Sequence, residues 1–362
     1  MSSITIYPCK PITIDYVGSF DVPSQGNISY TWGECAYDPD TETFYISGAY
    51  NQPQIGVYSK PQVGSVLTNK KWFDPTFGGW PTVASEGNGA RHRGFLAKGG
   101  MLWMNTTPFY VVTGSPTYAS TIGFTDGNSF KGWAKSSIHQ LKSTGPIFDI
   151  PESLREKFGG CDTGCFNQDQ QGGNMTNWGP ALYVFNRATD WTEDQNVPMT
   201  KVFDAIGSSN AFPDWWPDRK LTSAIMTPKY YIIGYSKSQG ARWYGNYGKG
   251  KNGYGLCWNE NEGTAKHYID SALNPGSPAT DGTEGQGFHA EGFHSCLLIA
   301  TVDSVISGNP VWQEVDLSSL GINYSSGEFR ITYDSVNDLI YGMERNAGKG
   351  GSLPKGHILR IS

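Results

Sequence analysis

The sequence is poor in charge and lacks the features of several large protein classes. Charged residues make up 17% of its 362 residues, below the roughly 25% of an average soluble domain. A net charge of −6 and a pI near 5.5 argue against a nucleic-acid partner, which needs a basic face. No run of 18 apolar residues occurs, so no membrane insertion is predicted. The N-terminus lacks the charged segment and apolar core of a Sec signal. Localisation stays open, and a virion-associated or otherwise exported protein is one alternative.

The cysteines do not form a metal-binding pattern. Of six cysteines, only Cys161 and Cys165 are close in sequence, and no second pair completes a zinc set. We therefore predict no metal and no cofactor, and buried thiols with at most one short disulfide between Cys161 and Cys165. The sequence also contains no P-loop and no G-x-S-x-G elbow.

Aromatic residues and glycine are abundant instead. Aromatics reach 14% and glycines number 46. Short aromatic and β-branched runs broken by Gly, Asn, Asp and Pro are typical of many short strands joined by tight turns. The only clear helix is predicted over 151–158. No linker divides the chain, so we predict one all-β domain over residues 1–362.

A repeated motif indicates the architecture. Tyr37 and Asp38 begin the segment YDPDTETFY, and Tyr333 and Asp334 begin YDSVNDLIY, each with a polar turn followed by apolar residues and Tyr. These hairpins resemble the inner strand pair of a blade in the β-propeller superfold. The two copies are 296 residues apart, and five intervals of about 59 residues suit one blade each. We prefer six blades, with five or seven as alternatives. Strands near 12–20 and 357–362 are expected to pair and close the ring.

A second resemblance is local. The segment 125–130, TDGNSF, with Trp133 beyond it, looks like the Asp-box turn of sialidase-type propellers. That box normally recurs in several blades, whereas one convincing copy is present here. It supports the propeller fold and does not imply a sialidase. A jelly roll or β-helix would need a shorter or stricter repeat than the chain shows.

Short glycine-containing segments precede several apolar runs and supply the candidate site. If these segments begin the innermost strands, they bring both charge signs and aromatic rings to one mouth of the central channel, a typical ligand-binding geometry. The alternative is that the charged members form structural ion pairs, Glu with Arg. The candidate ligand-binding residues are Trp32, Glu34, Arg91, His92, Arg93, Trp178, His294, Glu328 and Arg330.

Two classes of function fit these residues. The first is a recognition or assembly module that binds a glycan or a protein partner, or serves as a surface component of a larger particle such as a virion. The alternative is a carbohydrate-active enzyme at the channel mouth. Glu34 and Glu328 would act as a glycoside hydrolase pair, or His92 and His294 with Arg91 or Arg93 would act as a polysaccharide lyase. Because propellers host both classes, the fold does not choose between them.

Overall fold

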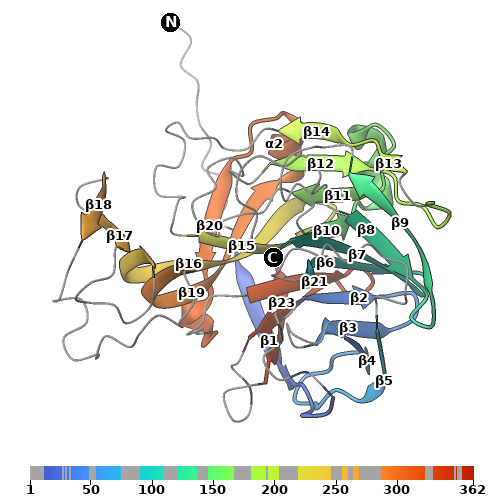
Figure 1. Ribbon diagram of the computed structural model, residues 1–362, viewed down its shortest axis with the longest axis horizontal. Coiled ribbons are helices and arrows are strands. Elements are labelled where there is room, and N and C mark those ends of the chain that lie inside the picture. Colours follow the sequence, from blue (N-terminus) through green and yellow to red (C-terminus); the bar gives the residue numbers. More distant parts are fainter. Residues whose placement is uncertain are drawn as a thin grey trace, which may run out of the picture.

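Five β-sheets, each built around four antiparallel strands, are arranged in a ring in the computed structural model of the protein (Figure 1). The structure describes residues 12–26, 28, 31, 34–48, 54–74, 90–108, 121–136, 146–166, 181–192, 195–203, 219–245, 255–259, 264–268, 287–322, 329–345, 348 and 353–362. Near the ends of several strands, including 90–93, 236–245 and 287–293, only the backbone is described.

Each blade runs from an innermost strand at the axis to an outermost strand at the rim. Blade one contains β2 (Cys35–Asp38), β3 (Thr43–Ser47), β4 (Ile55–Ser59) and β5 (Asn69–Phe73). Blade two contains β6 (Ala90–Lys98), β7 (Met101–Pro108), β8 (Thr121–Thr125) and β9 (Phe130–Ser136), with β13 (Asn196–Val197) parallel to β9. Blade three contains β10 (Ile147–Asp149), β11 (Thr163–Phe166), β12 (Leu182–Phe185) and β14 (Thr200–Phe203).

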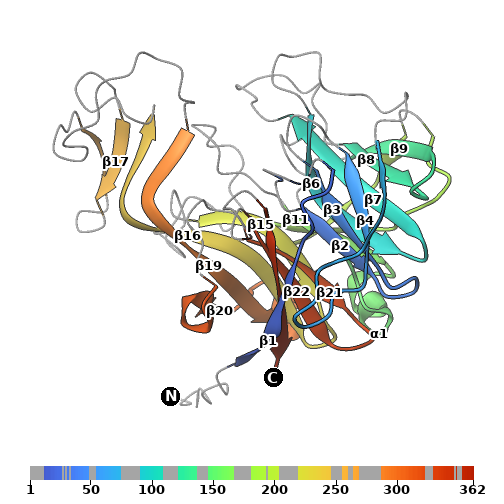
Figure 2. The same ribbon diagram turned by 90° about the horizontal axis from the view of Figure 1, so that it is seen from below.

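Blade four is enlarged. It contains β15 (Arg219–Met226), β16 (Tyr230–Gly245), β19 (Gly287–Thr301) and β20 (Trp312–Asp316), followed by the 3₁₀ turn η3 (Leu317–Leu320). The short helix α2 (Val302–Ile306) joins its last two strands. The distal halves of β16 and β19 continue beyond the sheet and carry β17 (Gly255–Asn259) and β18 (Thr264–Tyr268). Figure 2 shows this extension as an arm that bends away from the ring.

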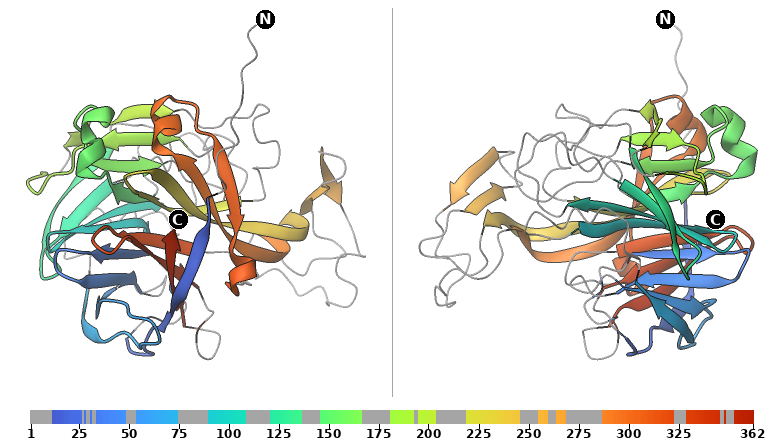
Figure 3. Two further views of the ribbon diagram at one scale, coloured as in Figure 1. Left: turned by 180° about the vertical axis from the view of Figure 1, so that it is seen from behind. Right: turned by 45° about the vertical axis from the view of Figure 1, so that its right-hand side comes forward.

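Blade five closes the ring with strands from both ends of the described chain. It contains β21 (Phe329–Asp334), β22 (Leu339–Glu344), β23 (Lys355–Ile361) and β1 (Ile14–Asp21). β1 pairs antiparallel with β23, from Ile14 opposite Ile361 to Asp21 opposite Lys355 (Figure 3). The predicted closure by N-terminal and C-terminal strands is confirmed.

The blades number five, so the preferred count of six is wrong and the alternative of five is correct. The innermost strands contact one another in a closed cycle of β2, β6, β10, β15 and β21. They begin at residues 35, 90, 147, 219 and 329, so the repeat length varies widely. Tyr37 and Tyr333 are therefore four blade intervals apart rather than five. The long arm of blade four accounts for much of the extra sequence between them.

The hydrophobic core is divided among the gaps between blades. Among the described residues, five buried clusters occur, and each joins the facing sides of two successive blades. In the gap between blades five and one, Phe20 and Phe44 lie edge to face with ring centroids 5.8 Å apart, and Tyr37 and Tyr341 are 5.1 Å apart. Because both faces of a blade are covered, strands such as β2 and β12 are buried at every position. Their sequences are accordingly near-continuous apolar runs rather than alternating ones.

The Tyr-Asp motifs form hairpin turns, as predicted. Asp38 is fully buried, and its carboxylate accepts hydrogen bonds from the backbone N–H of Asp40 and the hydroxyl of Thr41. It also accepts from the N–H groups of Gly99 and Gly100 at 3.2 and 2.6 Å, in the β6–β7 turn of the next blade. Asp38 therefore fastens blade one to blade two as well as holding its own turn.

In the blade-five copy of the motif, Asp334 accepts hydrogen bonds from its own blade. Asp334 accepts from the N–H groups of Val336 and Asn337, both at 3.1 Å, and from the hydroxyl of Tyr341 at 2.9 Å. Burial, and then the Asp334 carboxylate, raise the pKa of Tyr341, so this phenol stays protonated and donates. Tyr37 and Tyr333 pack in gaps between blades, which agrees with the structural role predicted for the motif.

Two smaller predictions can also be checked. The segment 125–130 is the turn between β8 and β9, where Asp126 accepts from the N–H groups of Asn128 and Ser129, both at 2.8 Å. The predicted helix appears as α1 (Glu152–Arg155) and the 3₁₀ turn η2 (Glu156–Phe158), and Gly159 ends it with a φ of 67°.

Cys161 and Cys165 are free thiols, so a disulfide between them is excluded. Cys165 is buried in the gap between blades two and three, whereas Cys161 packs against the gap between blades three and four. Their side chains thus face opposite sides of the same blade.

Candidate functional site at the channel axis

The axis of the ring has two ends, and candidate residues lie at both. We call the end where the innermost strands begin the entrance end, and the end where they finish the exit end. At the entrance end, the starts of β2, β6 and β21 lie side by side, because β2 contacts both of the other strands.

A buried ion pair crosses the entrance end. The carboxylate Oε1 of Glu34, directly before β2, is 2.9 Å from Nη2 of Arg330 in β21. Both residues are almost completely buried, at 2% and 1% exposure. Arg330 also donates through Nη1 to the carbonyl of Thr222 in β15. One guanidinium therefore connects three innermost strands.

The neighbourhood of this pair is tightly hydrogen-bonded. The hydroxyl of Thr222 donates to the carbonyls of Gly234, at 3.0 Å, and Phe329. The hydroxyl of Ser223 accepts from the N–H of Ile331 at 2.8 Å. Burial, and then the nearby Glu34 carboxylate, raise the pKa of Cys35, while Arg330 acts in the opposite direction. The Cys35 thiol therefore stays protonated and is not a nucleophile.

The structure locates some of the predicted site residues and not others. Glu34 and Arg330 are brought together, and Arg91, His92 and Arg93 follow one another in the first half of the innermost strand β6. Trp32, Trp178 and Glu328 lie outside the described residues. The Glu34–Glu328 pair therefore stays a prediction.

The premise that placed His294 and Trp178 at the axis is wrong. His294 is in β19, the third strand of blade four, where it pairs with Lys237. Its Nδ1 is 3.5 Å from Oδ2 of Asp316 in the outermost strand β20. The segment containing Trp178 leads into β12, which is likewise a third strand. Innermost and third strands of a four-stranded antiparallel sheet run in the same direction, so both begin at the same face, but the third strand is farther from the axis.

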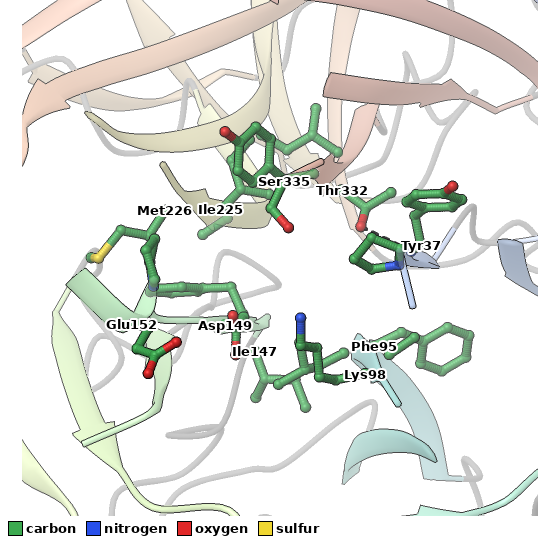
Figure 4. A pocket seen from close by; sticks show the side chains of 18 of the residues that line it. Tyr37, Phe95, Lys98, Ile147, Asp149, Glu152, Ile225, Met226, Thr332 and Ser335 are labelled. Atoms are coloured by element: carbon green, nitrogen blue, oxygen red, sulfur yellow. Dashed lines mark hydrogen bonds between the residues drawn. The ribbon is translucent and has the colours of Figure 1, made fainter. Parts of the chain in front are cut away.

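The exit end contains a cavity that the sequence did not indicate. Its volume is about 310 Å³, and its walls come from all five innermost strands and the turns that follow them (Figure 4). Apolar side chains of the innermost strands line it, including Ile147, Ile225 and Ile331. A cavity here could have been expected from the sequence, since the innermost strands of a propeller converge at both ends of the channel. Prolines also follow three of them, at Pro39, Pro151 and Pro228.

Polar groups surround the mouth of this cavity. Lys98 Nζ is 3.4 Å from Oδ2 of Asp40. Asp149 Oδ1 is 2.7 Å from Nη1 of Arg187 and 3.7 Å from Nη2 of Arg155. In Figure 4, Lys98 and Ser335 point into the opening from opposite sides, with Asp149 and Glu152 on a third side.

Within the described part of the chain, no group of three or more His, Cys, Asp or Glu is arranged to hold a metal ion. Among the same residues, no helix has the length and apolar character needed to cross a bilayer.

Fold and axis together define the class of protein: a five-bladed β-propeller with a buried ion pair at one end of its channel and a cavity at the other. No protein-family model matches the chain. No curated protein matches it either.

Similar solved structures include a GH43 endo-arabinanase from Bacillus licheniformis, at 13% identity and a TM-score of 0.35, covering 82% of this chain and 96% of that one. They also include the α-L-arabinanase of Cellvibrio cellulosa complexed with arabinohexaose, at 10% identity and a TM-score of 0.37, covering 93% and 96%. At these values the likeness says nothing about what this chain binds.

Proposed function

We propose that this propeller is a glycan-recognition module whose ligand binds at the entrance end of the channel. The observation that carries the proposal is the buried Glu34–Arg330 pair on the axis. Buried ion pairs are weak sources of stability, and well-packed apolar side chains often serve a core equally well. A buried ion pair where three innermost strands converge is therefore better explained by its positioning of the strand starts than by its contribution to stability.

Burial decides which residues of the entrance end are proposed to contact the ligand and which are proposed to support the site. Glu34 and Arg330 are too buried to touch a ligand, so they form the floor and fix the starts of β2 and β21. The ligand contacts are assigned to Arg91, His92 and Arg93 on the adjacent strand β6. Trp32 and Glu328 are proposed to contribute around them. Planar polar groups that bond pairs of hydroxyls, with aromatic rings that stack on a sugar face, are the chemistry of saccharide recognition.

The test is a glycan array followed by titration calorimetry of the ligands found. We expect Arg91→Ala and His92→Ala to weaken binding about tenfold or more, the scale of a lost charge-assisted hydrogen bond. Arg360→Ala is the matched control, because Arg360 is an exposed residue of β23 paired with the rim strand β1. Failure of every glycan to bind, or equal binding by all three variants, would contradict the proposal.

Carbohydrate cleavage at the same end is the second candidate, favoured by the succession of Arg91, His92 and Arg93 on an innermost strand beside Glu34. In a lyase, arginine would neutralise a uronate and histidine would accept the proton. Glu34, occupied by the Arg330 guanidinium, suits charge stabilisation better than proton donation. Release of reducing ends, or of unsaturated products followed by their ultraviolet absorbance, would distinguish cleavage from binding alone.

Attachment to a protein partner or to a larger particle such as a virion is a separate prediction, tested by co-purification of the chain with assembled particles.

A further inference from the structure

We infer that the cavity at the exit end is a second ligand site, and that it takes one neutral sugar ring. It lies at the opposite end of the channel from the glycan site proposed above and does not depend on that proposal. All the turns that border it belong to the described part of the chain.

The shape of the cavity limits the size of its ligand. Its volume of about 310 Å³ is at the small end of the roughly 300–1,000 Å³ range of ligand pockets. Apolar side chains such as Ile147 and Ile225 line it together with polar ones such as Lys98, Asp149 and Ser335. This arrangement suits a single ring that buries one face and keeps its polar substituents at the rim.

The charges at the mouth are already balanced within the protein. Lys98 has Asp40 as a neighbour at 3.4 Å. Asp149 has Arg187 at 2.7 Å and Arg155 at 3.7 Å. An anionic ligand would meet Asp149 and Glu152, and a cationic ligand would meet Lys98 and Arg155. A wholly apolar ligand would remove water from Lys98 without replacing its hydrogen bonds. A neutral polar ligand avoids all three costs.

The hydrogen-bonding groups suit hydroxyls in particular. Lys98 supplies donors and Glu152 supplies acceptors, while the hydroxyls of Ser335 and Thr332 do both. The Thr332 hydroxyl oxygen accepts from the N–H of Tyr37 at 3.1 Å, which leaves its own hydrogen to donate. A sugar hydroxyl is also both donor and acceptor, so a ring of hydroxyls can satisfy this mixed rim. The lining aromatics and prolines supply flat apolar surfaces for the face of the ring.

The experiment measures binding of free monosaccharides to the full chain by saturation-transfer NMR and titration calorimetry. The probes are D-glucose, D-galactose and D-xylose as neutral rings, with D-galacturonic acid and D-glucosamine as charged counterparts. We expect at least one neutral ring to bind with millimolar affinity, and its charged counterparts to bind about tenfold more weakly.

Two pairs of variants assign this binding to the cavity. Ser335→Trp should fill the mouth and abolish binding, whereas Val336→Trp should not, since Val336 is the neighbouring exposed residue and does not line the cavity. Lys98→Met should weaken binding about tenfold, whereas Lys229→Met should not, because Lys229 is exposed nearby and also does not line it. Circular dichroism melts confirm that each variant is folded.

Three outcomes would overturn the inference: no neutral ring binds, a charged probe binds more tightly than the neutral one, or Ser335→Trp and Val336→Trp bind equally. Arg91→Ala should leave this binding unchanged, so failure at the exit end and failure of the entrance-end proposal are distinguishable.

Discussion

At the scale of single residues, the buried polar side chains of this propeller act mainly as fasteners between blades. Arg330 joins β21 to the start of β2 and to β15, and Asp38 joins the turn of blade one to the turn of blade two. Gaps between blades are filled by non-directional apolar packing, which resists separation more than it resists sliding. Buried hydrogen bonds to charged groups add direction, because an unpaired buried carboxylate or guanidinium is costly.

Asp38→Ala tests this role. The change removes the acceptor for the N–H groups of Asp40, Gly99 and Gly100 and for the Thr41 hydroxyl. We expect the free energy of unfolding in urea to fall by about 2–3 kcal/mol. Asp303→Ala is the control and should change it by less than about 0.5 kcal/mol, because the Asp303 side chain is 86% exposed. Glycan binding should be unaffected. If Asp38→Ala unfolds like the control, or loses binding at full stability, the fastening role is wrong.

At the scale of elements, the sequence predicted strands and turns better than it predicted their places in the ring. The Tyr-Asp turns and the helix at 151–158 were predictable because their signals are local. The position of a strand within its blade was not. The segments before β12 and β19 resemble those before innermost strands, because first and third strands begin at the same face. This is why Trp178 and His294 were assigned to the axis.

The β8–β9 turn offers a pH test at this scale. The hydrogen bond from Lys131 lowers the pKa of Asp126, and the N–H groups of Ser129 and Asn128 add to the effect. A carboxyl group whose pKa is lowered by folding contributes stability above its unfolded pKa of about 3.9, and this contribution is lost as the pH falls further. Asp126→Asn should therefore cost about 1 kcal/mol at pH 7 in low salt.

Urea unfolding of wild type and Asp126→Asn between pH 7 and pH 3 measures this effect. The difference between the two proteins should narrow below about pH 4. It should also shrink in high salt, because the ion pair is partly exposed. A difference that stays constant across this pH range would show that the turn depends on its geometry rather than on the charge of Asp126.

At the scale of the whole molecule, the fold class and the closure of the ring were predictable, and the number of blades was not. Closure is dictated physically, since an open propeller would expose two sheet edges. The blade count depends on loop and arm lengths, which the core hardly constrains, and the spacing of innermost strands ranges from 55 to 110 residues. The meeting of Glu34 and Arg330 at the axis followed from the same reasoning. Convergence of innermost strands was applied to their beginnings, where Glu34 and Arg330 do meet, but not to their ends, where the cavity lies.

Ring closure itself gives the last prediction. β1 covers the edge of β23 and carries Phe20, which is 1% exposed and packs against Phe44 and Tyr341. The absence of a side chain at Gly356 makes room for the Phe20 ring, since a Cβ there would lie 2.0 Å from it. Deleting residues 1–20 removes the Phe20 side chain and most of β1, and leaves β23 as an open edge. We therefore expect the protein to unfold or aggregate. Deleting only residues 1–11 keeps β1 and should leave a monomer with a similar melting temperature. Size-exclusion chromatography and circular dichroism melts compare the two. A monomeric 1–20 deletion that melts like the full chain would mean that the ring does not depend on this closure.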